Sequence, residues 1–160
     1  MKKTIAVLAA AAIFLSGFFA IPVQAAQFDI NFATESKSVY LENLDTGIVV
    51  YAKEPDARRY PASTTKIMTY IITAENVKDF KNTYVTIKEK TLKLLDGTGS
   101  SVAGLESGEQ LSVYQLLNCL MIPSGNDAAL VLADYIGKGS IQKFVDMMNR
   151  KAEELGGEKI

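Results

Sequence analysis

The sequence predicts an α/β protein of the α+β kind, in which an N-terminal β-hairpin is followed by a cluster of helices. Residues 38–44 and 48–53 are rich in Val, Ile, Leu and Tyr, and Asp45-Thr46-Gly47 between them supplies turn residues. This pattern is typical of two strands joined by a tight turn. Further along the chain, four stretches have the apolar spacing or capping signals of helices: residues 63–76, 112–122, 127–136 and 140–155.

The first of these helices, residues 63–76, has little polar face. Ile67, Met68, Ile71 and Ile72 place apolar side chains around most of its circumference. Such a helix is typical of the centre of a domain.

The segment between the first two helices is more polar. Residues 84–87 predict a short strand, and Ser112 with Gln115 has the capping-box pattern that begins the second helix. A turn-rich loop is predicted by four glycines: Gly97, Gly99, Gly104 and Gly108. Nothing after residue 87 has the pattern of a strand that could widen the sheet, and an isolated hairpin is only marginally stable. We therefore expect an incomplete sheet and the first part of a larger domain.

The N-terminus predicts export. Lys2 and Lys3 precede an almost wholly apolar stretch, residues 5–21, and Val23-Gln24-Ala25 has the small residues that a signal peptidase prefers. We interpret residues 1–25 as a secretory signal peptide and residues 26–160 as the mature part. An uncleaved membrane anchor is the alternative. Both interpretations predict an extracytoplasmic protein.

Charge and cysteine content narrow the function classes. Residues 26–160 keep 15 basic and 18 acidic groups, because residues 1–25 contain two lysines and no acid. This balance argues against nucleic acid as a partner. The single cysteine, Cys119, forms no internal disulfide and lies among apolar residues, so we interpret it as a small core residue.

Two short motifs suggest serine chemistry without histidine. Ser63 and Lys66 form Ser-x-x-Lys at a helix start, and Ser124 and Asn126 form Ser-x-Asn after the second helix. The chain has no histidine, so a Ser-His-Asp triad is excluded. Residues three apart on a helix share one face, which lets Lys66 reach the Ser63 hydroxyl. Lysine accepts a proton only in its neutral form, which an apolar pocket or a neighbouring cation favours.

Simpler interpretations exist for several of these polar residues. Ser140 and Lys143 form a second Ser-x-x-Lys, which we interpret as a helix cap with a solvated lysine. Asp127 is interpreted as a cap of the following helix rather than a catalytic group. Arg58 and Arg59 are interpreted as solvated loop charges, although they could attract a substrate carboxylate.

The chain resembles the serine D-alanyl-D-alanine carboxypeptidases, the low-molecular-weight penicillin-binding proteins. The resemblance rests on Pro-Ala-Ser-Thr-Thr-Lys-Ile-Met-Thr at residues 61–69 and on Pro-Ser-Gly-Asn-Asp-Ala-Ala at residues 123–129. It extends over residues 28–157 and includes the segments 41–47, 99–101 and 108–109. It implies an incomplete serine β-lactamase/transpeptidase-like fold, with residues 26–160 as a partial catalytic domain.

The resemblance also implies roles for the motif residues. Ser63 would be the nucleophile that forms an acyl-enzyme, Lys66 the general base, Ser124 the proton relay and Asn126 a contact to the substrate peptide. The implied reaction removes the terminal D-alanine of peptidoglycan stem peptides, and β-lactams acylate the same serine. No cofactor and no metal are implied.

The chain also departs from the family pattern. The third family motif, Lys-Thr-Gly, supplies a cation, a contact to the substrate carboxylate and part of the oxyanion hole, and the tripeptide does not occur in residues 1–160. The other sheet strands and the C-terminal region with a membrane-associating helix are also missing, so membrane association is expected only through an uncleaved signal or that region. We expect these residues alone to be inactive. One alternative is a non-catalytic exported protein, either an inactive remnant or a module that binds peptidoglycan or penicillin. The other is a class A-type β-lactamase. Gly125 argues against the β-lactamase, because those enzymes usually carry Asp at this position.

Overall fold

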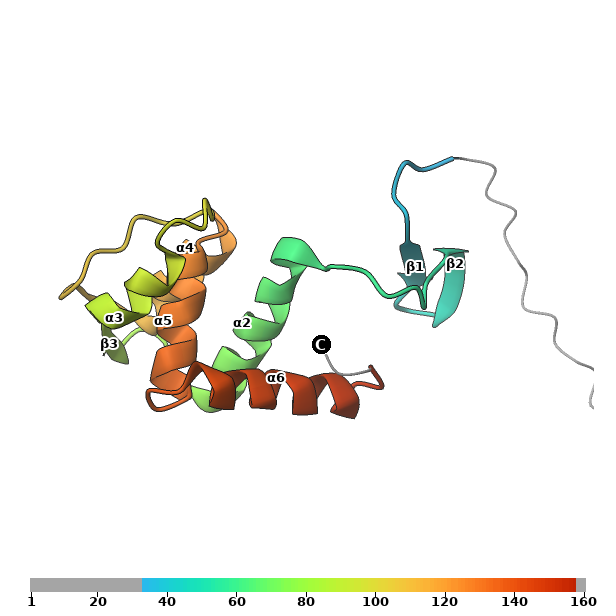
Figure 1. Cartoon of the computed structure of the whole chain (residues 1–160). Coiled ribbons are helices and arrows are strands. Elements are labelled where there is room, and N and C mark those ends of the chain that lie inside the picture. The colour runs from blue at the N-terminus through green and yellow to red at the C-terminus, as the bar shows by residue number, and fades with distance from the viewer. Residues whose placement is uncertain (1–32, 158–160) are drawn as a thin grey trace, which may run out of the picture. The chain divides into compact units, whose positions relative to one another are not determined.

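The computed structural model describes residues 33–157, so the predicted signal peptide at residues 1–25 lies outside the described part. The chain divides into two compact units, the first ending at Arg59 and the second beginning at Tyr60. Figure 1 shows a hairpin in the first unit and helices in the second.

The first unit contains the predicted hairpin. Strands β1 (Val39–Asn43) and β2 (Ile48–Lys53) pair antiparallel, with Asn43 opposite Ile48. The turn closes because Gly47 adopts a φ of 66°, which glycine tolerates without steric cost, and because its N–H donates to the Asn43 carbonyl at 2.8 Å. The hairpin prediction is confirmed.

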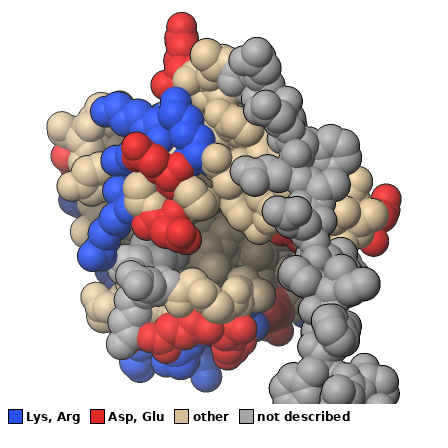
Figure 2. Space-filling view, turned by 90° about the vertical axis from the view of Figure 1, so that its right-hand side faces the viewer, with Lys and Arg blue, Asp and Glu red and all other residues tan. Residues whose placement is uncertain are grey.

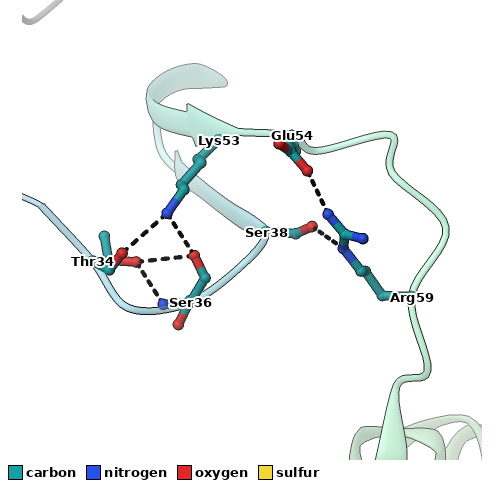
Figure 3. Close-up of polar contacts among 6 residues, drawn as sticks. All are labelled: Thr34, Ser36, Ser38, Lys53, Glu54 and Arg59. Atoms are coloured by element: carbon teal, nitrogen blue, oxygen red, sulfur yellow. Dashed lines mark hydrogen bonds and ion pairs between the residues drawn. The ribbon is translucent and has the colours of Figure 1, made fainter.

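The segment before β1 is tied to the end of β2. The Lys53 ammonium donates to the backbone carbonyls of Thr34, at 3.0 Å, and Ser36, at 2.8 Å. Figure 3 shows Lys53 reaching across to this segment. A single lysine therefore satisfies two carbonyls of a stretch that has no regular structure of its own.

The second unit is mainly helical. Its elements in chain order are η1 (Ala62–Thr64), α2 (Thr65–Asn76), β3 (Tyr84–Thr86), α3 (Glu89–Leu92), η2 (Lys93–Leu95), β4 (Gln110–Ser112), α4 (Val113–Met121), α5 (Asn126–Ile136) and α6 (Ile141–Glu154). The four predicted helices are confirmed, with ends that differ by one or two residues. The short helices α3 and η2 were not predicted, because a single turn carries too little periodic pattern to be recognised.

One strand that the sequence did not predict follows residue 87, but it does not widen the hairpin sheet. Strand β4 pairs antiparallel with β3, with Val85 opposite Leu111, and forms a second sheet separate from the hairpin. β4 has only three residues and leads directly into α4, so no alternating pattern could reveal it. The predicted capping box is confirmed at this junction, where Ser112 and Gln115 exchange hydrogen bonds.

Helix α5 lies at the centre of the second unit. It contacts α2, α3, α4 and α6, and Figure 1 shows α6 crossing the lower ends of α2 and α5. The buried apolar side chains form two clusters. The larger one contains Val77, Val85, Ile87, Val113, Leu116, Leu117, Leu120, Ala128, Val131 and Leu132. The smaller one contains Ile72, Ala133, Phe144 and Met148.

Helix α2 is less enclosed than its composition predicts. Its buried residues are Lys66, Thr69, Ile72 and Thr73, whereas Ile67 is 54% exposed. Contacts with α5 and α6 thus cover a largely polar face of the helix and leave part of its apolar face open.

The surface carries both signs of charge. On the face drawn in Figure 2, basic and acidic side chains lie next to one another, and neither sign covers the face alone. Within residues 33–157, no helix combines the length and the apolar character needed to cross a bilayer.

Candidate active site

Ser63 and Lys66 lie together at the start of α2. Ser63 is the central residue of the short helix η1, and Lys66 is the second residue of α2, three positions later. The Lys66 Nζ donates to Ser63 Oγ at 3.4 Å. Ser63 is exposed whereas Lys66 is only 7% exposed, so a reachable hydroxyl contacts an enclosed amine.

Ser124 reaches the same hydroxyl from the loop between α4 and α5. The Oγ atoms of Ser124 and Ser63 are 3.0 Å apart, within hydrogen-bond distance. The Ser63 hydroxyl therefore lies within hydrogen-bond distance of both an amine and a second hydroxyl. The tertiary fold brings the two sequence motifs together, although 61 positions separate them.

Lys66 is a buried lysine without an acidic partner in the described part of the chain. Its one hydrogen bond among residues 33–157 is the contact with Ser63, and no carboxylate in this part of the chain forms an ion pair with it. Buried lysines are usually paired with an acid. Within the described residues, the Ser63 hydroxyl is therefore the hydrogen-bond partner of this buried amine.

Two residues at the site have a strained backbone. Ala62, which precedes the nucleophile candidate, has a φ of 49°, and Ser124 has a φ of 59°. These are two of the four non-glycine residues with positive φ within residues 33–157. Such conformations cluster at functional sites because the surrounding structure must hold them. Sequence reasoning missed this feature, since neither residue is glycine or asparagine.

Asn126 has a side-chain amide next to the serine loop, which we define as residues 122–125 between α4 and α5. It is the first residue of α5, and its backbone N–H donates to the Ser101 carbonyl at 2.9 Å. Its half-buried side chain forms no hydrogen bond with any residue in 33–157. A half-buried amide with unused donors and acceptors is suited to hydrogen bonding with a peptide ligand.

Gly125 fits where no other residue would. A Cβ atom at this position would lie 2.6 Å from Asp127 Oδ1, 2.8 Å from the Cys119 carbonyl oxygen and 2.9 Å from the Ala103 Cβ. The middle position of Ser-Gly-Asn therefore has no room for the Asp that class A-type β-lactamases usually carry.

A family model described as D-alanyl-D-alanine carboxypeptidase matches residues 23–159. The chain belongs to the D-alanyl-D-alanine carboxypeptidase family. It is 41% identical over 124 residues to the D-alanyl-D-alanine carboxypeptidase DacF of Bacillus subtilis, which covers 78% of this chain and 31% of that protein. It is 34% identical over 152 residues to the D-alanyl-D-alanine carboxypeptidase DacA of Haemophilus influenzae, and this match covers 89% of this chain and 38% of that protein.

Solved structures of this family share the fold. The crystal structure of a Streptomyces DD-transpeptidase is similar, with a TM-score of 0.71 and 36% identity over 80% of this chain and 52% of that one. Penicillin-binding protein 5 from Haemophilus influenzae has a TM-score of 0.69 at 32% identity and covers 80% of this chain and 38% of that one. The predicted fold and family are confirmed, and the chain spans between about a third and a half of the length of these relatives.

The second Ser-x-x-Lys is a helix cap, as predicted. Ser140 is the N-cap of α6, and its hydroxyl accepts the backbone N–H of Lys143 at 3.3 Å. The Lys143 side chain is exposed. Only the first copy of the family motif therefore brings a lysine amine to a serine hydroxyl.

Arg59 is held within the hairpin unit. Its guanidinium donates to Ser38 Oγ at 3.0 Å and forms an ion pair with Glu54, as Figure 3 shows. The side chain is nevertheless 43% exposed, in agreement with the interpretation of a surface charge. Arg58 is exposed as well.

Cys119 is a packed thiol rather than a reactive one. It is partly buried against the larger core cluster, as the sequence predicted. Burial raises the pKa of the Cys119 thiol, and the negative charges of Asp127 and Glu109 raise it further. The thiolate needed for nucleophilic chemistry is thus disfavoured.

Asp127 connects the first turn of α5 to a distant loop. Its carboxylate accepts the N–H of Ala128 in the first turn of α5, but its other hydrogen bonds come from the loop at residues 103–105. The interpretation of Asp127 as the helix cap is therefore wrong: the N-cap is Gly125, and Asp127 is the second residue of α5. The loop donors could not be found from the sequence because they lie more than 20 positions away.

Proposed function

We propose that this protein is a serine-type D-alanyl-D-alanine carboxypeptidase that removes the terminal D-alanine from peptidoglycan stem peptides. The observation that carries the proposal is the double contact at Ser63, whose hydroxyl lies within reach of both Lys66 and Ser124. The family and the named relatives support the substrate class.

The geometry supports a two-step acyl transfer. Neutral Lys66 takes the proton of Ser63 Oγ as this oxygen bonds to the carbonyl carbon of the penultimate D-alanine. The C–N bond then breaks, and the amine of the leaving D-alanine receives a proton through Ser124. This transfer leaves Lys66 neutral again. In the second step Lys66 takes a proton from the water that attacks the ester carbon, and it gives this proton to Ser63 Oγ as the C–Oγ bond of the ester breaks. Asn126 holds the peptide amide during both steps.

We further propose that the protein works outside the cytoplasm and that β-lactams acylate Ser63. Residues 1–25 support export through their basic start, apolar stretch and small residues before Ala26.

The direct test is D-alanine release from a D-Ala-D-Ala tripeptide by the complete gene product. We expect release by the wild type, none by Ser63→Ala, and normal release by Ser140→Ala, which alters only the second copy of the motif. Release that survives Ser63→Ala would refute the proposal. Stoichiometric binding of the peptide without any release would instead favour a non-catalytic peptidoglycan-binding module.

A further inference from the structure

Asp127 is a buried carboxylate whose partners are all backbone N–H groups. It is 3% exposed, and its Oδ1 accepts Ala103 N–H and Ala128 N–H, each at 2.9 Å. Its Oδ2 accepts Gly104 N–H at 3.0 Å and Leu105 N–H at 3.1 Å. In the described part of the chain no lysine or arginine pairs with it. Converging N–H dipoles and the positive end of α5 therefore compensate its charge.

The loop that Asp127 binds also forms hydrogen bonds with residues on both sides of Ser124. The Ser101 hydroxyl donates to the Pro123 carbonyl at 3.1 Å, and the Ser101 carbonyl accepts the Asn126 N–H at 2.9 Å. Gly125 packs against the Asp127 carboxylate itself. Hydrogen bonds on both sides of Ser124 thus connect the serine loop to the loop at residues 101–105.

Ser124 needs such support because its backbone is strained. A serine at a φ of 59° relaxes to a more favourable conformation unless its neighbours prevent this. Helix α5 alone cannot hold Ser124 in this conformation, because Ser124 precedes the helix and the N-cap Gly125 provides no side-chain hydrogen bond.

We propose that Asp127 is a positioning residue for the acyl transfer. Its carboxylate holds the loop at residues 101–105 against the start of α5. This loop in turn keeps the Ser124 hydroxyl close to Ser63, and it fixes the backbone of Asn126. The assignment rests on the proposed function. Asp127 acts through Ser101 and the backbone, because its own hydrogen bonds include neither Ser63 nor Lys66.

The test compares two buried acids of the same helix. Asp127→Asn places an amide NH₂ against N–H donors of the loop, and we expect acylation by a fluorescent penicillin to slow by about ten- to hundredfold in the complete gene product. Asp134→Asn is the matched control, because Asp134 also lies buried on α5 but pairs with Lys88 at 2.6 Å, away from the serine loop. We expect it to lower the melting temperature and to leave the acylation rate near that of the wild type.

Two further measurements separate positioning from a general loss of structure. Asp127→Asn should lower the acylation rate constant more than the affinity of the non-covalent penicillin complex. Hydrogen exchange of the Ala103, Gly104 and Leu105 amides should accelerate while that of α6 stays unchanged. Equal losses of acylation in both variants, in proportion to their stability, would overturn the proposal, as would a wild-type rate in Asp127→Asn.

A milder variant decides the matter if Asp127→Asn does not fold. Ser101→Ala removes only the hydrogen bond to Pro123 from an exposed side chain, and we expect a several-fold slower acylation in a stable protein. An unchanged rate would then overturn the proposal. If penicillin does not acylate the wild-type protein, the proposed function itself is refuted. If the wild type is acylated normally and the Asp127→Asn and Ser101→Ala variants are acylated at the same rate, only the role of Asp127 is refuted.

Discussion

At Ser63, one hydroxyl oxygen has two polar neighbours of different chemistry. Lys66 lies at 3.4 Å and is the group that can remove the proton, and Ser124 lies at 3.0 Å and can pass a proton onward. The first contact follows from local sequence, because residues three apart meet on a helix. The second depends on the packing of α4 and α5, which no local pattern describes.

Lys66→Arg tests whether the lysine acts as a base. Arginine keeps the positive charge but does not lose its proton at any working pH. We expect Lys66→Arg to slow penicillin acylation by at least about a hundredfold, nearly as much as Lys66→Ala. Lys143→Arg, in the second copy of the motif, is the control and should leave the rate unchanged. Near-normal acylation by Lys66→Arg would mean that the lysine serves as a charge only.

Gly125→Ala tests the close packing beneath the serine loop. Three atoms lie within 2.9 Å of the added Cβ, and two of them belong to a backbone carbonyl and a fixed carboxylate. We expect a loss of about 1–3 kcal/mol in the free energy of unfolding, measured with urea, together with slower acylation. Gly108→Ala has open space but a φ of 88°, so it should lower stability without slowing acylation. Wild-type stability in Gly125→Ala would show that the loop adapts easily.

Among the elements, helix starts agree best between sequence and structure. Ser112 with Gln115 and Ser140 with Lys143 were recognised because capping uses side chains within one turn. Strand β4 was missed because its partner β3 lies more than 20 positions earlier and only pairing defines it. The loop at residues 101–105 was predicted only as a turn-rich segment, because its hydrogen bonds to Asp127 are equally distant in sequence.

Ser112→Ala tests the capping box of α4. The Ser112 hydroxyl accepts the Gln115 N–H at 3.2 Å, and the Gln115 side chain accepts the Ser112 N–H at 2.9 Å. We expect a loss of about 1 kcal/mol in the free energy of unfolding, measured with urea. Ser112→Thr keeps the hydroxyl and should lose less. Equal stability of Ser112→Ala and the wild type would show that β4 pairing alone fixes the start of α4.

At the scale of the whole molecule, much apolar surface is open. Leu44 is 92% exposed in the hairpin unit, and Ile122 and Ile67 are 78% and 54% exposed in the helical unit. The sheet of each unit has two strands in the described part of the chain. The expectation from sequence that residues 26–160 need further structure around them stays a prediction, and exposed apolar surface is the property through which it can be tested.

Residues 26–160, produced alone, should therefore be poorly folded. We expect them to bind a hydrophobic dye, to aggregate, and to release no detectable D-alanine from a D-Ala-D-Ala tripeptide. Calorimetry and dye fluorescence measure the first two properties. A sharp cooperative melt together with D-alanine release would show that this segment completes its own site, for example by pairing of two copies.

The central claim is that Ser63 is the residue that forms the acyl-enzyme. The most direct measurement is mass spectrometry of the complete gene product after reaction with penicillin and proteolytic digestion. The account predicts one covalent adduct, located on Ser63 and absent from the Ser63→Ala variant. An adduct on Ser140 or Ser124, or one that persists in Ser63→Ala, would contradict it.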